Sequence, residues 1–146
     1  MKEYSIKEVS DMFQLTPATL RYYEDMGILT NVPRTASGRR IYKEMHINRL
    51  RTICCFKNTG MTITQLQEFF TYEEDQDKHI DDILTLLQQQ RKTVEEQIKE
   101  LQKAYTHVLR KQHYFQDIKT SLENGEPHPD WSDYKYKDFT DQSPKP

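Results

Sequence analysis

The sequence predicts a mostly helical protein in which a compact head of short helices, with one small β wing, precedes a single long helix. Two observations support this fold class. Residues 77–121 contain neither Gly nor Pro, and their apolar residues recur at steps of mostly three and four, the period of an amphipathic helix. The first 72 residues instead divide into short periodic segments separated by turn residues. We therefore expect an all-α fold with a small β wing.

Two short helices are predicted near the N-terminus. Ser5–Glu8 has capping-box spacing and starts a helix that ends near Phe13. Thr16 at the N-cap and Pro17 at the first helical position start a second helix, which continues to about Met26. Two short helices joined by so few residues predict a helix-turn-helix.

The next segments complete the head. Residues 28–42 favour two short extended segments around a Ser37–Gly38 turn, and such a β hairpin after a helix-turn-helix is a wing. Helices are then predicted over residues 43–59 and 63–72. An acidic joint, residues 73–77, leads into the long helix.

The long helix is too long for one subunit to cover. At about 1.5 Å per residue it would reach roughly 65 Å, beyond the width of a domain this chain could build. We therefore expect a homodimer in which a second copy covers the apolar stripe as a coiled coil. Gln90 and Gln112 interrupt this stripe and are predicted to set its register. The stripe consists of Ile80, Ile83, Leu84, Leu87, Val94, Ile98, Leu101, Tyr105, Val108, Phe115, Ile118 and Leu122.

Composition and charge limit the classes of function. The 146 residues carry no apolar run near 18 residues and no signal peptide, so we expect a cytoplasmic protein without membrane contact. Residues 1–72 hold 10 Lys and Arg against 7 Asp and Glu, whereas residues 73–146 hold 11 against 16. A basic head is a mild indication of a polyanionic partner, although ordinary surface variation explains the asymmetry equally well. No nucleophile with a positioned base and no Gly-rich phosphate loop is present, so an enzyme is not expected.

The second helix and the wing carry the residues suited to DNA. Helical spacing places Ala18, Arg21, Tyr22 and Asp25 on the face opposite Leu20, and an outward Arg-Tyr pair beside small residues suits a major groove. Hydroxyls at the helix start and the arginines of the wing can meet phosphates. The alternative is that these residues cover a small solvated domain.

These segments resemble the DNA-binding head of the MerR family of transcription regulators. The resemblance rests on S-I-x-E-V-S, L-T-P-A-T-L-R-Y-Y-E-x-x-G-I-L, R-x-x-S-G-R-R-x-Y and I-x-R-L, and with the long helix it covers residues 2–122. It implies an antiparallel coiled-coil dimer that binds a pseudo-palindromic promoter. Activated family members bend and untwist an overlong promoter spacer so that RNA polymerase can use it.

The resemblance also implies a division of the chain and a set of contacts. Residues 1–72 are expected to form a winged helix-turn-helix DNA-binding domain, 77–122 the dimerisation helix, and 123–146 a short tail that is partly disordered. Arg21 and Tyr22 match the family's recognition-helix contacts. The full set predicted to bind double-stranded promoter DNA is Thr16, Pro17, Thr19, Arg21, Tyr22, Arg34, Ser37, Arg39, Arg40 and Tyr42.

No metal or other cofactor is expected. Metal-sensing family members carry cysteines at the end of the dimerisation helix and in the loop after it, where this sequence has none. Multidrug-sensing members append a large domain, for which the roughly 24 residues after Leu122 are too few. The tail aromatics are expected to pack on the dimer, with a small-ligand cage as the alternative. The histidines lack metal-ligand spacing and are expected at the surface: His46, His79, His107, His113 and His128.

The adjacent Cys54 and Cys55 suggest the effector. The motif C-F-K-N-T-G resembles the region around the single cysteine of the aldehyde- and thiol-stress-responsive (AdhR/NmlR-like) branch, and Cys55 is the matching position. Cys54 lies in the apolar stripe of its helix, whereas Arg51 and Lys57 favour a thiolate at Cys55. The extra Cys54 leaves open which thiol reacts. Two alternatives stay open: gating by a small organic ligand near the tail aromatics, and a coiled-coil adaptor without DNA binding.

Overall fold

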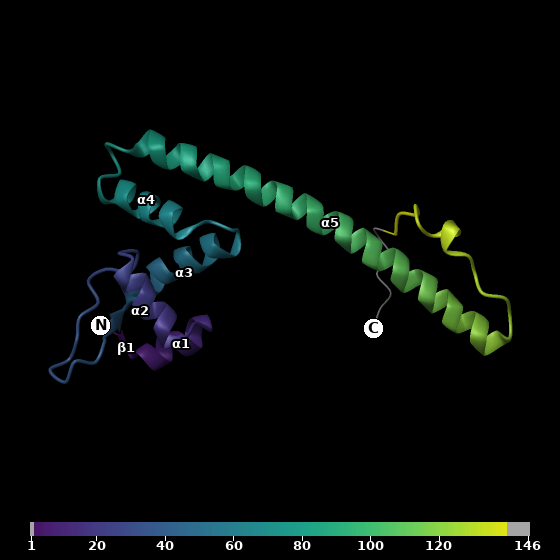
Figure 1. Ribbon diagram of the computed structural model, residues 1–146, viewed down its shortest axis with the longest axis horizontal. Helices are drawn as coiled ribbons and strands as arrows, with labels where there is room; N and C mark the ends of the chain where they lie inside the picture. The colour runs from purple at the N-terminus through teal and green to yellow at the C-terminus, as the bar shows by residue number, and fades with distance from the viewer. Residues whose placement is uncertain (1, 140–146) are drawn as a thin grey trace. The chain divides into compact units, whose positions relative to one another are not determined.

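The computed structural model describes residues 2–139 and confirms a mostly helical chain with one small antiparallel sheet (Figure 1). The helices are α1 (Ile6–Phe13), α2 (Pro17–Asp25), α3 (Glu44–Asn58), α4 (Ile63–Glu74) and α5 (Ile80–Asn124), followed by a 3-10 turn, η1 (Trp131–Asp133). The strands are β1 (Glu3–Tyr4) and β2 (Tyr42–Lys43). The chain divides into two compact units, residues 1–92 and 93–146. Within residues 2–139, no helix is both long and apolar enough to cross a membrane.

The two N-terminal helices begin as the sequence predicts. The Ser5 hydroxyl accepts the Glu8 N–H at 3.1 Å, and the Glu8 carboxylate accepts the Ser5 N–H at 3.1 Å, so the capping box is complete. Thr16 caps α2 by accepting the Thr19 N–H at 3.1 Å. The connection between the helices turns at Gln14, which adopts a left-handed conformation with φ of 54°.

A core of apolar residues holds α1 to α4 and β2 together. Its fully or nearly buried members are Val9, Leu20, Tyr23, Ile28, Leu29, Tyr42, Ile47, Leu50, Ile53, Met61, Leu66, Phe69 and Phe70. Ile83, Leu86 and Leu87 of α5 pack against this core, so the first turns of α5 belong to the head. This corrects the predicted coiled-coil stripe, because Ile83 and Leu87 are used within their own chain. Gln90 is also corrected, since its amide donates to Thr59 Oγ1 at 2.5 Å instead of pointing to a seam.

The predicted wing hairpin is present but short. One antiparallel bridge pairs Arg34 with Arg40, and the Thr35 N–H donates to the Arg39 carbonyl and the Ile41 N–H to the Pro33 carbonyl, both at 2.8 Å. The paired strands are β1 and β2, with Glu3 opposite Lys43 and Tyr4 opposite Tyr42. A two-residue strand at the N-terminus carries no alternating pattern, so the sequence could not reveal it.

His46 is buried, and its predicted surface position is wrong. The side chain is 1% exposed. Its Nδ1 accepts the Lys43 N–H at 2.9 Å at the start of α3, and its Nε2 lies 3.1 Å from the carbonyls of both Thr30 and Asn31. Because Nδ1 accepts a backbone N–H, the ring proton lies on Nε2 and donates to these carbonyls. His46 thus ties the loop before the wing to α3.

In the second unit, the tail returns along α5 (Figure 1). Arg110 Nε donates to the Lys137 carbonyl at 2.6 Å, and the Tyr134 hydroxyl donates to Asp117 at 2.5 Å. The bond to Asp117 raises the pKa of Tyr134 to about 12. The ring centres of Trp131 and Tyr114 lie 5.3 Å apart, and those of His113 and Phe139 lie 4.1 Å apart. Lys111 Nζ lies 3.7 Å from the centre of the Trp131 ring. The tail aromatics therefore pack on their own helix. The tail is predicted to be partly disordered at its end, residues 142–146, and these lie outside the described residues.

Candidate nucleic-acid interface

One face of α2 is exposed and carries the residues that the sequence singles out. Arg21 and Tyr22 are exposed together with Ala18 and Asp25, whereas Leu20 on the opposite face is fully buried. The helix is therefore fixed by its apolar side and offers its polar side to a partner. The Tyr22 side chain is 45% exposed, so its aromatic ring is accessible to a partner.

The start of α2 adds polar groups to this face. Thr16 is exposed, and its hydroxyl oxygen lies 2.9 Å from that of Thr19. Pro17 occupies the first helical position, where its missing N–H costs no hydrogen bond. The N–H groups of Thr19 and Leu20 already donate to the Thr16 hydroxyl and carbonyl, so the start of α2 favours an anion mainly through the helix dipole.

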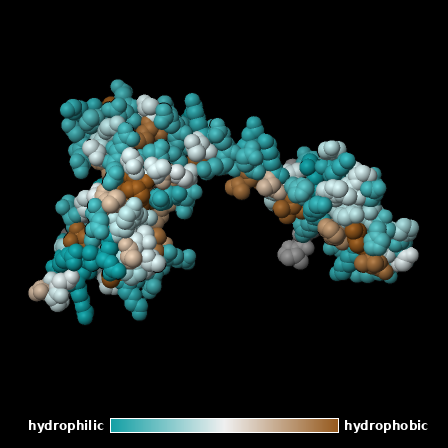
Figure 2. Space-filling view, in the orientation of Figure 1, coloured by the Kyte–Doolittle hydropathy of each residue, from teal (hydrophilic) through white to brown (hydrophobic). Residues whose placement is uncertain are grey.

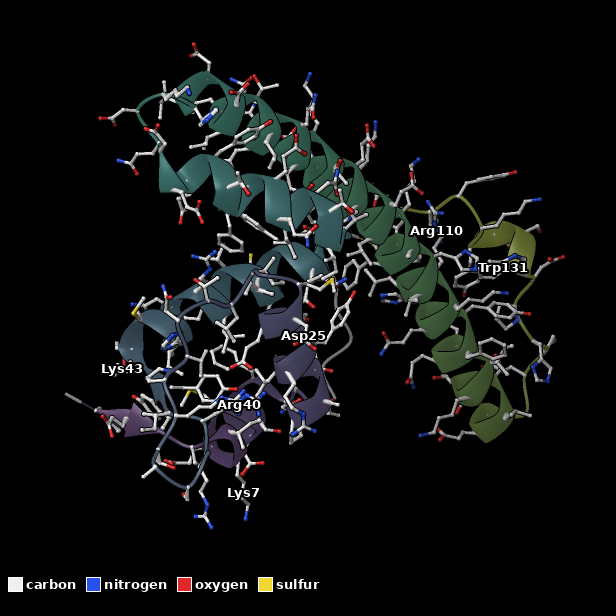
Figure 3. All side chains as sticks on the ribbon, turned by 60° about the vertical axis from the view of Figure 1, so that its left-hand side comes forward. Lys7, Asp25, Arg40, Lys43, Arg110 and Trp131 are labelled. Carbon is white, nitrogen blue, oxygen red and sulfur yellow. The ribbon has the colours of Figure 1, made fainter. Side chains whose placement is uncertain are left out.

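A basic hollow lies between the start of α1, the face of α2 and the wing. Its volume is about 440 Å³, and it is lined by Ser5, Ile6, Lys7, Arg21, Gly38, Arg39 and Arg40. Figure 3 shows Lys7 and Arg40 in this part of the head. Four cationic side chains from three separate segments thus share one concave surface, an arrangement suited to the phosphates of a nucleic-acid backbone. We call this surface the basic hollow.

Lys7 is the residue that sequence reasoning missed. It lies in the first turn of α1, inside the capping box, and reads as an ordinary exposed helix residue. Only the fold brings Lys7 close to Arg21 and to the wing, and the wing lies more than 30 residues further along the chain. No local pattern encodes that proximity.

Arg40 holds the wing to α2 as well as lining the hollow. Its Nε donates to the Glu24 carboxylate at 2.8 Å, and the two side chains are only 17% and 15% exposed. This partly buried, charge-assisted pair fixes the base of the wing next to the exposed face of α2. The wing tip is ordered by its own turn, in which the Thr35 hydroxyl accepts the Arg39 N–H at 3.1 Å and contacts the Ser37 hydroxyl at 2.9 Å. Arg34 and Arg39 remain exposed on it.

The position of Tyr42 in the wing predicts a DNA contact, but the structure puts this residue in the core. Its side chain is fully buried, and its hydroxyl has no hydrogen-bond partner among the described residues. Burial, with a smaller effect from Glu24, raises the pKa of Tyr42 to about 12. We therefore remove Tyr42 from the candidate contacts, because no surface partner can reach it.

Replacing Tyr42 with phenylalanine is expected to stabilise the head, by roughly 1 kcal/mol at pH 7, because a buried hydroxyl without a partner is removed. The raised pKa means that folding favours the neutral phenol. In the wild type, the stability that depends on a neutral Tyr42 phenol is intact below pH 10 and is lost as the pH rises from about 10 to about 12. The advantage of Tyr42→Phe should therefore grow in urea unfolding at pH 11. Tyr136→Phe at an 82% exposed position is the control, and equal alkaline losses in wild type and Tyr42→Phe would contradict the assignment.

The two cysteines occupy different environments on α3. Cys55 is exposed, whereas Cys54 is half-buried and burial raises the pKa of its thiol. Cys54 lies close enough to the phenol of Tyr23, on α2, to contribute to the raised pKa of Tyr23, although burial is the larger cause. Arg51 donates to the Asn48 side chain at 3.0 Å. Between residues 2 and 139, no three His, Cys, Asp or Glu side chains gather as a metal site would require.

Comparisons with known proteins point to one family. Residues 4–73 match the model of the MerR HTH family regulatory proteins, and residues 47–110 match the MerR DNA-binding model. An uncharacterised HTH-type transcriptional regulator of Haemophilus influenzae is 32% identical over 106 residues, which cover 73% of this chain and 78% of that protein. The HTH-type transcriptional regulator AdhR of Bacillus subtilis is 39% identical over 77 residues, 53% of this chain and 55% of AdhR. The match thus spans little more than half of AdhR.

Solved structures give the same result for the fold. The crystal structure of HiNmlR, described as a MerR family regulator lacking the sensor domain and bound to promoter DNA, superposes with a TM-score of 0.75. Its sequence is 27% identical, and the alignment covers 86% of this chain and 92% of that chain. A MerR family regulator from Bacillus thuringiensis is 32% identical with a TM-score of 0.65, over 75% of this chain and 96% of that chain.

Proposed function

Because the chain belongs to the MerR family of helix-turn-helix transcriptional regulators, and resembles its AdhR/NmlR-like branch, we propose that it controls a promoter as a homodimer in response to electrophile or redox stress. The family consists of DNA-binding regulators and not of enzymes. The observation that carries the proposal is the exposed Arg21–Tyr22 face of α2 beside the basic hollow.

In the proposed complex, α2 enters the major groove of promoter DNA and the basic hollow and wing hold the flanking backbone. An arginine can donate two hydrogen bonds to the O6 and N7 atoms of guanine, which gives Arg21 a role in reading sequence. Lys7, Arg34 and Arg39 would pair with phosphates, which position the head without reading bases. Residues 1–72 would form this DNA-binding part, which acts in the cytoplasm where promoter DNA lies.

A second copy of the chain is the proposed partner of α5. Ile98, Leu101, Tyr105, Val108 and Phe115 are each half to two-thirds exposed and follow heptad spacing, with Gln112 at the polar position between the last two. We call these residues the seam. Figure 2 shows apolar residues exposed among hydrophilic ones in this part of the chain. A regularly spaced apolar seam of this kind is typical of a coiled-coil interface.

The tail supports this reading because it occupies the other side of the helix. Arg110, Tyr114 and Asp117 contact the tail, and Figure 3 shows Arg110 close to Trp131. These positions are offset by two residues from Val108, Gln112 and Phe115 of the seam, a rotation of about 200° at roughly 100° per residue. The chain therefore covers the back of α5 itself and leaves Leu101, Val108 and Phe115 of the seam for a partner. We propose residues 77–122 as the dimerisation helix and 123–146 as a tail that braces it.

The proposed action follows the family mechanism. Two heads held at a fixed spacing by antiparallel helices would bind the two halves of a pseudo-palindromic promoter. Activation would bend and untwist the spacer so that RNA polymerase can use the promoter. A movement of the head relative to α5 would have to change the contacts that join them. These contacts include the packing of Ile83 and Leu87 on the head core and the Gln90–Thr59 hydrogen bond.

Cys55 is the proposed sensor thiol. It is exposed near the C-terminal end of α3, one turn before Thr59, and Thr59 receives the amide of Gln90 from α5. An electrophilic aldehyde or an oxidant could therefore modify Cys55 without unfolding the head, and the change would arise next to the junction of α3 with α5. Cys54 is half-buried with a thiol that favours its neutral form, so it is the less reactive of the two.

A promoter reporter tests the sensor role. We expect Cys55→Ser to abolish most induction by formaldehyde or diamide while leaving DNA binding unchanged, because serine removes the nucleophilic sulfur at an exposed position. Cys54→Ser is the matched control and should keep induction. Induction that persists in both single variants and in the double variant would eliminate a thiol sensor. Loss of induction in Cys54→Ser alone would reassign the role to that residue.

A second candidate effector is a small organic anion bound beside the tail. A hollow of about 580 Å³ lies between α5 and the tail, and its lining includes Lys99, Lys103, Tyr105, Arg110 and Asp138. Three cations against one carboxylate would favour an anion with an apolar portion. In this case Arg110→Ala, and not Cys55→Ser, would remove induction. The coiled-coil adaptor is set aside, because the chain belongs to a family of DNA-binding regulators.

A further inference from the structure

The C-terminal end of α2 is held by side chains from two other helices. Met26 caps α2, and Gly27 follows with φ of 75°, which reverses the chain. The N–H groups of Met26 to Leu29 donate back to carbonyls of α2 at residues 22–24. The carbonyls of Met26 and Ile28 lie at and just beyond the C-cap of α2, where a carbonyl needs a donor from elsewhere.

Gln67 and Arg49 supply these donors. Gln67 Nε2, from α4, donates to the Met26 carbonyl at 2.8 Å. Arg49 Nε, from α3, donates to the Ile28 carbonyl at 2.7 Å. Both side chains are partly buried and come from positions 21 and 41 residues away along the chain. The end of α2 is thus fixed by two separate elements, at the carbonyls of Met26 and Ile28.

Arg49 also joins α3 to α4. Its guanidinium lies 3.9 Å from the centre of the Phe70 ring on α4, a cation–π contact. Burial lowers the pKa of Arg49, and Glu73 and Glu74 at the end of α4 oppose that shift. The guanidinium is therefore held between the end of α2 and the face of α4. Arg49 and Gln67 are both half-buried, whereas Arg21 and Tyr22 on α2 are exposed.

Helix α4 in turn contacts the start of α5. Leu66, Phe69 and Phe70 belong to the core against which Ile83 and Leu87 pack. The Tyr72 ring of α4 lies 5.0 Å from the His79 ring just before α5. A continuous set of contacts therefore runs from the start of α5, through α4, to the C-terminal end of α2.

We infer that Gln67, supported by Arg49, is a positioning residue that sets the orientation of α2 for sequence reading. It acts through the backbone of Met26 and touches no DNA. The inference rests on the proposed role of α2 as the recognition helix. A positioning residue of this kind affects binding to the correct sequence, which needs α2 aligned, more than binding to any sequence, which needs only cations near phosphates.

The test compares specific and non-specific binding of full-length variants. The probe is a DNA fragment that the wild-type chain selects from a random pool, and the competitor is a scrambled duplex of the same length. Gln67→Met keeps length and helix propensity but removes the donor. We expect its affinity for the selected fragment to fall roughly five- to tenfold, as the loss of one net hydrogen bond predicts. Affinity for the scrambled duplex should stay within twofold.

Three further variants make the outcome decisive. Gln67→Lys restores a donor and should recover most of the specificity, whereas Gln67→Glu offers only acceptors and should not. Thr64→Met, at an exposed position of α4, controls for the introduced side chain. Equal losses on both DNAs, or no rescue by lysine, would overturn the inference.

Arg21→Ala separates this inference from the one on which it rests. If Arg21→Ala weakens specific binding and Gln67→Met leaves it unchanged, the positioning role fails and the recognition helix stands. If Arg21→Ala binds the selected fragment as the wild type does, both fail together. A fall in specific binding by both variants, with rescue by Gln67→Lys, supports both.

Discussion

Arg21→Ala is expected to weaken binding to the promoter sequence by roughly 5- to 150-fold at fixed salt, the range for losing one bidentate contact to a base. Arg21 is exposed on the face of α2 opposite Leu20, and it also lines the basic hollow. The substitution removes no buried group, so the stability of the head should change little. Fluorescence anisotropy with labelled duplexes at two salt concentrations measures the effect.

The salt dependence distinguishes two roles for Arg21. If it reads a guanine, the loss should be confined to one base position and the salt slope should be nearly unchanged. If it pairs with a phosphate, binding should weaken equally on all sequences and the slope should fall by about one. Arg51→Ala, an exposed arginine on α3, is the matched control and should bind as the wild type does. Unchanged binding by Arg21→Ala would show that α2 does not enter the groove.

The sequence predicts the local parts of this site because they depend on local rules. Helix periodicity placed Leu20 inward and Arg21 outward on α2, and both positions are confirmed. Cap chemistry at Ser5 and Thr16 located the starts of α1 and α2. Each of these inferences compares residues no more than one or two turns apart, where backbone geometry alone fixes their relation.

The parts that the sequence could not predict depend on contacts between distant segments. His46 is buried because the Thr30 and Asn31 carbonyls lie against its ring, and no spacing rule links these positions. Gln90 fits a polar position of a coiled coil equally well, but the fold brings it to Thr59, 31 residues earlier. Tyr42 ends a basic, wing-like motif, yet its pairing with β1 turns the side chain into the core. Lys7 gains its place in the basic hollow by the same route.

Charged substitutions in the seam are expected to dissociate the proposed dimer. Leu101 and Val108 are 69% and 61% exposed, face away from the tail, and would be buried twice in a symmetric pair. Burying one such side chain contributes roughly 1.5–3 kcal/mol, so four losses exceed a 100-fold change in the dissociation constant. Burying the added carboxylates in an apolar interface would weaken dimerisation further. The double variant Leu101→Glu, Val108→Glu should therefore be a monomer at micromolar concentration in sedimentation equilibrium.

The same variant tests whether DNA binding needs two heads. The head core contains neither Leu101 nor Val108, so circular dichroism and the melting of the head should match the wild type. Binding to a full promoter should fall to the affinity of one head for one half-site, because the helix no longer couples two binding events. Gln102→Glu adds one carboxylate beside the seam and should remain a dimer. A double variant that stays dimeric and binds the promoter fully would place the subunit interface elsewhere, and the exposed seam would then need another partner.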